Sequence, residues 1–251
     1  MTPPTTDGNG AQPLPSEVAD WRDRTRIFLR PIAAPSILGL FGFAGATFVV
    51  AAFLAGIYGN ADTPEFLFPF AAAFGGFAQF TAAMWGYIAR DGLATAMHGM
   101  WGSFWIAFGV LFLLVSTGTL TLTGEAFNAF GFWFYALAAI TAIGAVAALY
   151  ENVALTLVLA TLAIGAALLG VGYNVDATPV AGQGWLAAGG WVLIVSAVAA
   201  AYTAGAMMLE GAAHRVVLPL GKYARASNTP GARVTSAIEL EQGEVGVRQG
   251  Q

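Results

Sequence analysis

Residues 71–108 read AAAFGGFAQFTAAMWGYIARDGLATAMHGMWGSFWIAF, and this stretch decides how the rest of the chain is interpreted. Most of it is apolar, yet it contains groups that a simple membrane anchor does not need. These groups are Gly75, Gly76, Gln79, Arg90, Asp91, His98, Trp101 and Ser103. The mixture indicates helices that cross a membrane and let something polar pass.

The composition of the whole chain agrees with a membrane location. Hydrophobic residues make up 57% of the 251 residues and charged residues only 10%. A soluble domain usually carries about 25% charged residues. The mean hydropathy is +0.69. We therefore expect an all-α integral membrane protein with one membrane domain.

The residues available for chemistry are few. With no cysteine in the chain, disulfides, cysteine zinc sites and thiol nucleophiles are excluded. Two histidines, His98 and His214, give no metal-ligand spacing, and the chain has no phosphate-binding loop and no basic patch suited to nucleic acid. We expect no catalytic residue, no metal, no cofactor and no nucleic-acid partner, so passage of a small solute is favoured over enzymatic activity.

Six apolar runs are long enough to span a bilayer, whose hydrocarbon core of about 30 Å takes roughly 20 helical residues. We predict six transmembrane helices, at approximately 36–58, 66–88, 93–116, 126–149, 152–173 and 185–209. The segments between them carry turn residues. Residues 1–33 are expected to be a disordered or interfacial segment, 34–221 the transport domain, and 222–251 a disordered cytoplasmic tail.

The positions of the basic residues predict the orientation. All ten lie before the first run, between the second and third, or after the sixth: Arg22, Arg24, Arg26, Arg30, Arg90, Arg215, Lys222, Arg225, Arg233 and Arg248. The other loops hold Asp62, Glu65, Glu125 and Asp176. Because cytoplasmic loops are enriched in Lys and Arg, we predict that both termini are cytoplasmic in a plasma or inner membrane, which requires an even number of spans.

Three polar side chains in the central spans have two possible interpretations. Gln79 must be hydrogen-bonded or face a pore, because a lone amide in lipid is costly. His98 shares a helix face with Trp101 and could carry a proton, or it could be structural. Ser103 could contact the solute, or it could donate to the carbonyl four residues earlier.

The start of the first run contains a stripe of small residues. Gly39, Gly42 and Gly45 recur every three residues, which indicates a packing seam that could also bring Phe43 close to a passage. Pro35 and Ser36 occupy the first turn of the predicted helix. Free amides there would attract a carboxylate if that helix end faces a cavity.

Four motifs in register resemble the succinate–acetate permease family, also called acetate uptake transporters. They are APSILGLFGF at 34–43, GGFAQFTAAMWGY at 75–87, WGSFW at 101–105 and RVVLPLG at 215–221. The resemblance implies six helices per protomer, a homohexamer, and a pathway through each subunit for acetate, related short carboxylates or succinate, as a channel or with protons.

The resemblance also implies where the pathway narrows. The family's hydrophobic ring falls on Phe43, Trp101 and Leu162, with Trp101 standing where the family has Tyr, and the family's glutamine falls on Gln79. Our hypothesis is that the ring accepts the methyl group and gates the pathway, while Gln79 supplies a neutral donor. Two alternatives remain open: a channel for another small solute such as formate or ammonia, and a membrane sensor or scaffold that transports nothing.

Overall fold

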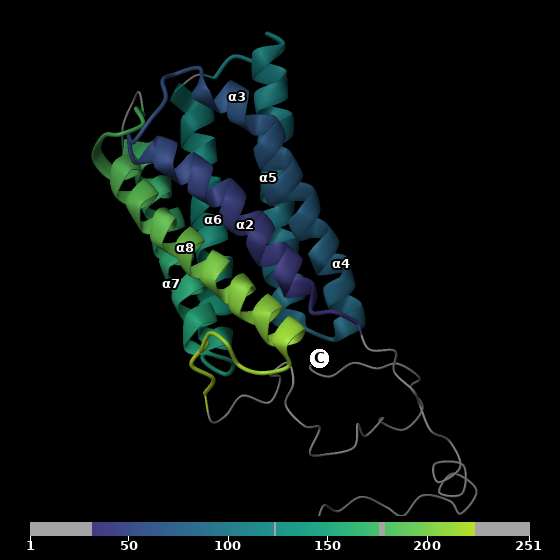
Figure 1. The fold of residues 1–251 in the computed structure, drawn as a ribbon. Helices are drawn as coiled ribbons and strands as arrows, with labels where there is room; N and C mark the ends of the chain where they lie inside the picture. The colour runs from purple at the N-terminus through teal and green to yellow at the C-terminus, as the bar shows by residue number, and fades with distance from the viewer. Residues whose placement is uncertain (1–31, 123, 176–178, 224–251) are drawn as a thin grey trace, which may run out of the picture. The chain divides into compact units, whose positions relative to one another are not determined.

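The computed structural model describes residues 32–122, 124–175 and 179–223. Within these ranges, six helical segments are long and apolar enough to cross a membrane, as the sequence predicted. They are α2 (Pro35–Leu54), the composite of α3 (Thr63–Phe70), η1 (Ala71–Ala78) and α4 (Gln79–Ala89), then α5 (Gly92–Ser116), α6 (Gly124–Ala148), α7 (Val153–Val175) and α8 (Gly184–Ala213) (Figure 1). Of the tails expected at 1–33 and 222–251, residues 1–31 and 224–251 lie outside the described residues.

Two helix ends differ by four residues from the predicted boundaries, and the others differ by at most three. The first helix ends at Leu54 instead of 58, because Gly56 adopts a positive φ of 78° that leaves the helix. The last helix continues to Ala213 instead of 209 and ends where His214 takes the left-handed conformation. The apolar pattern does not locate the first end, because the apolar run continues past Leu54 through Ile57 and Tyr58. It does not locate the second, because the last helix continues beyond its apolar run through the charged Glu210.

We expected the second span to be one regular α-helix, but it is not. After Pro69, which has no backbone N–H to donate, residues 71–78 form a π-helical segment before α-helical geometry resumes at Gln79. Gly75 and Gly76 lie in this segment and press against α5, since a Cβ on Gly75 would meet the ring of Trp105 at 2.5 Å. Wide turns of this kind occur often at functional sites.

Glycines set the close approach of α2 to its neighbours. A Cβ on Gly39 would collide with the ring of His98, and one on Gly42 would collide with the carbonyl of Phe74. The predicted packing seam is therefore present, and it joins α2 to both α5 and η1. α2 also packs against α8, while α6, α7 and α8 pack in succession (Figure 1).

One end of the bundle holds the 90–91 and 149–152 turns, and we call it the Arg90 end. Asp91 caps α5 by accepting from Ala94 N at 2.8 Å, and Asn152 caps α7 by accepting from Leu155 N at 2.8 Å. The segment after α8 also reaches this turn, where Val153 N donates to Gly221 O and Tyr223 N donates to Glu151 O. The opposite end, which we call the Gly56 end, holds the bond from Gly182 N to Leu54 O.

Candidate functional site

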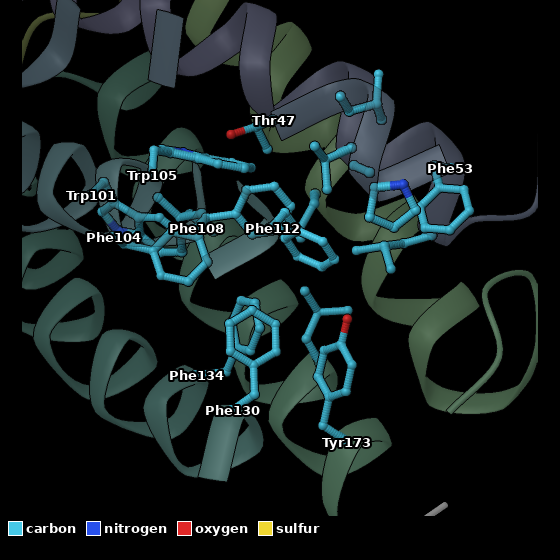
Figure 2. Close-up of a pocket in the computed structure, with 18 residues that line it drawn as sticks. Thr47, Phe53, Trp101, Phe104, Trp105, Phe108, Phe112, Phe130, Phe134 and Tyr173 are labelled. Carbon is cyan, nitrogen blue, oxygen red and sulfur yellow. The ribbon is translucent and has the colours of Figure 1, made fainter. Parts of the chain in front are cut away.

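An apolar cavity of about 50 Å³ lies inside the bundle toward the Gly56 end. Its walls come from α2, α3, α5, α6, α7 and α8, and Figure 2 shows aromatic rings facing one another across it. The lining residues are Thr47, Val50, Ala51, Phe53, Leu54, Pro64, Leu67, Trp101, Phe104, Trp105, Phe108, Phe112, Phe130, Phe134, Leu162, Leu169, Tyr173 and Leu193. One water needs about 10–15 Å³ by a comparable measure, so the cavity suits a solute of a few heavy atoms.

The aromatic wall follows from helical spacing on α5. Residues 101, 104, 105, 108 and 112 recur at three or four positions and so share one face. Their rings meet mainly edge to face, as between Trp101 and Phe104, whose centroids are 5.5 Å apart at 74°. This geometry is favourable for aromatic pairs and gives the cavity a rigid, apolar side.

The three residues assigned to a ring by resemblance lie close to the inner limit of the cavity. Trp101 and Leu162 line it, and both are buried. Phe43 is not among the lining residues, but its ring contacts that of Trp101 at a centroid distance of 6.3 Å and an angle of 69°. The contact joins α2 to α5 at the point where the cavity stops.

Trp101 is held by a partner that the sequence analysis missed. Its indole Nε1 donates to the hydroxyl of Thr141 on α6 at 2.9 Å, and that hydroxyl donates onward to Leu137 O at 2.7 Å. Thr141 is fully buried. A threonine in an apolar span was the only available signal, and nothing in the sequence connects two residues 40 positions apart.

Gln79 and His98 form a hydrogen-bonded pair beside Gly39. Gln79 Nε2 donates to Gly75 O at 2.8 Å, which turns its Oε1 toward His98 Nδ1 at 3.3 Å. An amide oxygen only accepts, so Nδ1 is the protonated nitrogen in this arrangement. The interhelical bond that the sequence left open is thus present, and the pair lies outside the set of cavity-lining residues.

The remaining candidate residues lie farther from the cavity. Ser103 is exposed on the outside of α5 and donates to Gly99 O at 2.7 Å, the backbone bond that one interpretation predicted. Pro35 and Ser36 are half-buried in the first turn of α2, where no side chain caps the helix. Their position leaves the α2 start at the Arg90 end, across the bundle from the cavity.

The electrostatics of the cavity are set by neutral groups. Among the described residues that line it, none carries a formal charge. Two lining side chains, Thr47 and Trp105, have buried polar atoms that find no hydrogen-bond partner within the described part of the chain. The described residues also hold no cluster of His, Cys, Asp or Glu that could bind a metal ion.

Comparison with known proteins places this arrangement in context. The model of the GPR1/FUN34/yaaH family matches residues 23–222. Among solved structures, the bacterial acetate channel SatP is similar, with a TM-score of 0.68 at 22% sequence identity, over 76% of this chain and 100% of that one. A search of curated proteins gives no match.

Proposed function

Because the chain belongs to the GPR1/FUN34/yaaH family, we propose that it is a membrane channel or transporter for acetate and related short monocarboxylates. The observation that carries the proposal is the small aromatic cavity that stops at the contact between Phe43 and Trp101. Similarity to a bacterial acetate channel supports it. The six apolar helices supply the membrane-spanning body that such a pathway needs.

The proposed mechanism separates the two ends of the solute. A carboxylic acid with a pKa near that of Asp, about 4, is an anion at neutral pH, and an unpartnered anion inside a membrane is expensive. The ring of Phe43, Trp101 and Leu162 receives the methyl group and acts as a hydrophobic constriction. Neutral donors on either side hold the carboxylate without trapping it.

We propose that Gln79 and His98 form a polar binding position for the carboxylate on the Arg90 side of the ring. The Gln79 amide has two hydrogens, of which one is used in the bond to Gly75 O. The second is available to a carboxylate that has passed the ring. His98 is the proposed proton-handling group. The helix start at Pro35 and Ser36 is the proposed point at which the anion meets backbone amides.

The orientation and assembly are also proposals. We place the Arg90 end in the cytoplasm, with both termini there, in a plasma or inner membrane. Arg90 supports this placement, since it lies in a turn at that end, whereas Asp62, Glu65 and Glu125 lie in or beside loops at the other. A homohexamer with one pathway per protomer is the proposed assembly.

The absence of cysteine from the chain allows a clean test of orientation. Gly92→Cys adds a thiol at the Arg90 end, where nothing lies within 4 Å of the new Cβ, and Asp62→Cys adds one at the Gly56 end. In intact cells a membrane-impermeant maleimide should label only the second variant. Labelling of the first variant alone would show that the protein has the opposite orientation. Native mass spectrometry of the purified protein measures the subunit number, and six is expected.

The function itself is tested by flux. Purified protein in proteoliposomes should take up labelled acetate faster than empty vesicles, and unlabelled short monocarboxylates should compete. Imposing a pH gradient separates a channel, whose flux follows the acetate gradient, from proton-coupled transport. Competition by formate, succinate and ammonium defines the solute class. Vesicles that show no flux of any of these solutes would overturn the proposal in favour of a sensor or scaffold.

A further inference from the structure

Two buried donors in the cavity wall stand out because they are unused. The side chains of Thr47 and Trp105 are 3% and 4% exposed, and neither Oγ1 of Thr47 nor Nε1 of Trp105 has a hydrogen-bond partner among the described residues. Buried polar groups are almost always paired, and each exception needs an explanation. Both side chains line the same cavity.

The comparison with similar groups in the same bundle sharpens the exception. The other hydroxyl residues that are buried as a whole donate to backbone carbonyls: Thr141 to Leu137, Ser196 to Val158 and Thr203 to Ala199. The half-buried Thr95 also has an unpaired Oγ1 among the described residues, but Thr95 does not line the cavity. Thr47 lies in a regular helix and could bond a carbonyl in the same way, but it does not. Likewise, the buried indole of Trp101 is paired, whereas that of Trp105 is not.

Helical geometry brings the two unpaired groups to the same place. Thr47 lies four residues after Phe43 on α2, and Trp105 lies four residues after Trp101 on α5. Residues four apart share a helix face, and both helices run from the Arg90 end to the Gly56 end. The contact between Phe43 and Trp101 is therefore followed, about 6 Å further along, by Thr47 and Trp105.

The π-helical segment η1 supports the closeness of this pair through a shared neighbour, Gly75. A Cβ on Gly75 would lie 2.6 Å from Cδ1 of Trp105 and 2.8 Å from Cβ of Ala46. Cδ1 is bonded to Nε1, and Ala46 directly precedes Thr47, so the donor edge of the indole lies beside the α2 segment that carries Thr47. Figure 2 shows the hydroxyl of Thr47 turned to the side on which the indole lies.

The chemistry of the two groups restricts what they can hold. An indole N–H only donates, and a hydroxyl donates or accepts, so the occupant must offer acceptors. A carboxylate has two acceptor oxygens and no donor, which matches two neutral donors, while an ammonium ion has donors alone. The surrounding lining is apolar and aromatic, as in the rings of Phe104 and Phe108, and it suits a short alkyl group.

We propose that Thr47 and Trp105 form a carboxylate-binding subsite for short monocarboxylates, one helical turn before the constriction on the Gly56 side. The inference rests on the proposed function, because it takes acetate as the solute. In the subsite the Thr47 hydroxyl and the Trp105 indole N–H donate to the two carboxylate oxygens, and the methyl group lies among the rings. With no formal charge in the wall, the anion is held weakly enough to move on to the ring.

The subsite is tested by NMR on the full-length protein labelled with ¹⁵N-tryptophan in nanodiscs. The indole N–H signal that disappears in Trp105→Phe belongs to Trp105. Adding acetate should shift this signal downfield in a saturable way. The shift should be lost or should need about tenfold more acetate in Thr47→Val, since a hydrogen bond to a charged group typically changes affinity by that factor or more. Thr47→Ser, which keeps a hydroxyl, should bind as the parent protein does.

Two controls separate binding from folding. Ser196→Ala removes a buried hydroxyl that bonds Val158 O and should leave the acetate titration unchanged. Thr47→Val should keep or raise the melting temperature, because it removes an unpaired group, whereas a structural hydroxyl would lower it. A lowered melting temperature with an unchanged acetate titration would therefore assign Thr47 to packing and overturn the subsite.

The outcomes also separate the subsite from the function. Absence of acetate flux in the parent protein would remove the proposed function and the subsite with it. Normal flux in the parent, together with an unmoved Trp105 signal and an unchanged half-saturating acetate concentration in Thr47→Val and Trp105→Phe, would overturn the subsite alone. Sodium chloride at equal ionic strength should not shift the Trp105 signal. A shift equal to that with acetate would show that the subsite binds any small anion and is not specific for carboxylates.

Discussion

The indole of Trp101 is hydrogen-bonded to the hydroxyl of Thr141 across the interface between α5 and α6, at 2.9 Å. The largest side chain at the inner limit of the cavity is therefore fixed on one side by a bond and on the other by the ring of Phe43. A fixed ring gives a defined aperture.

Replacing Thr141 by Val should weaken the fold by leaving the Trp101 N–H unpaired. An unsatisfied buried donor costs about 1–3 kcal/mol, so the free energy of unfolding should fall by about that amount. Thr141→Ser, which restores a hydroxyl, should recover most of it. Denaturant unfolding in detergent measures the difference, and equal stabilities for the Val and Ser variants would show that the bond contributes nothing.

Trp101→Ala should enlarge the aperture and relax the size selectivity. Removing the indole takes away the largest part of the ring while Phe43 and Leu162 remain. We expect a higher ratio of butyrate to acetate uptake in proteoliposomes, with a stability cost of about 3–5 kcal/mol. Trp133→Ala is a matched control, because Trp133 is exposed on α6, and it should keep the parent ratio. An unchanged ratio in Trp101→Ala would remove Trp101 from the constriction.

Gly39→Ala should disturb the hydrogen-bonded pair of His98 and Gln79. The new Cβ would lie 2.5 Å from the imidazole ring, so the ring must move away from its 3.3 Å contact with the amide. Overpacking of this kind costs about 1–3 kcal/mol. Gly205→Ala, with nothing within 4 Å of its Cβ, should be neutral or stabilising. Thermal unfolding compares the two, and similar melting temperatures would contradict the close contact.

Glu151 should make the stability of the protein depend on pH. It lies in the turn between α6 and α7, where burial, and then the charge of Asp91, raise the pKa of Glu151 to about 7 from 4.5. The folded state therefore binds the proton more tightly than the unfolded state. The stabilisation that protonated Glu151 gives the folded state is fully present below about pH 4.5 and is lost as the pH rises through about 7.

The melting temperature should accordingly fall between pH 5 and pH 8, buffer values chosen to bracket the pKa shift. Glu151→Gln should flatten this dependence, because the amide does not titrate. Glu125→Gln changes a carboxyl at the Gly56 end and should leave the slope as it is. A Glu151→Gln variant with the parent slope would show that another group is responsible.

The six helices were predictable because the length and apolarity of each run are set by the bilayer. The packing seam at Gly39 and Gly42 was also predictable, since small residues in a membrane helix indicate close packing between helices. The π-helical segment was not, because its hydrogen bonds differ by one position and leave no compositional trace. The pairing of Trp101 with Thr141 depends on which helices become neighbours. The unpaired state of Thr47 is a property of its surroundings, which no single residue type discloses.

The wide turn at 71–78 has a consequence for how related chains are aligned. An α-helix rotates by about 100° per residue, and a π-helical turn accommodates one more residue than an α-helical turn does. A relative without this turn would therefore align here with a single-residue gap, yet would present equivalent faces before and after it. A one-residue gap within 71–78 should therefore be read as the loss of the π-helical turn, with the helix faces on both sides of it kept. A helical wheel that uses about 100° per residue throughout this span assigns the residues after the turn to the wrong face.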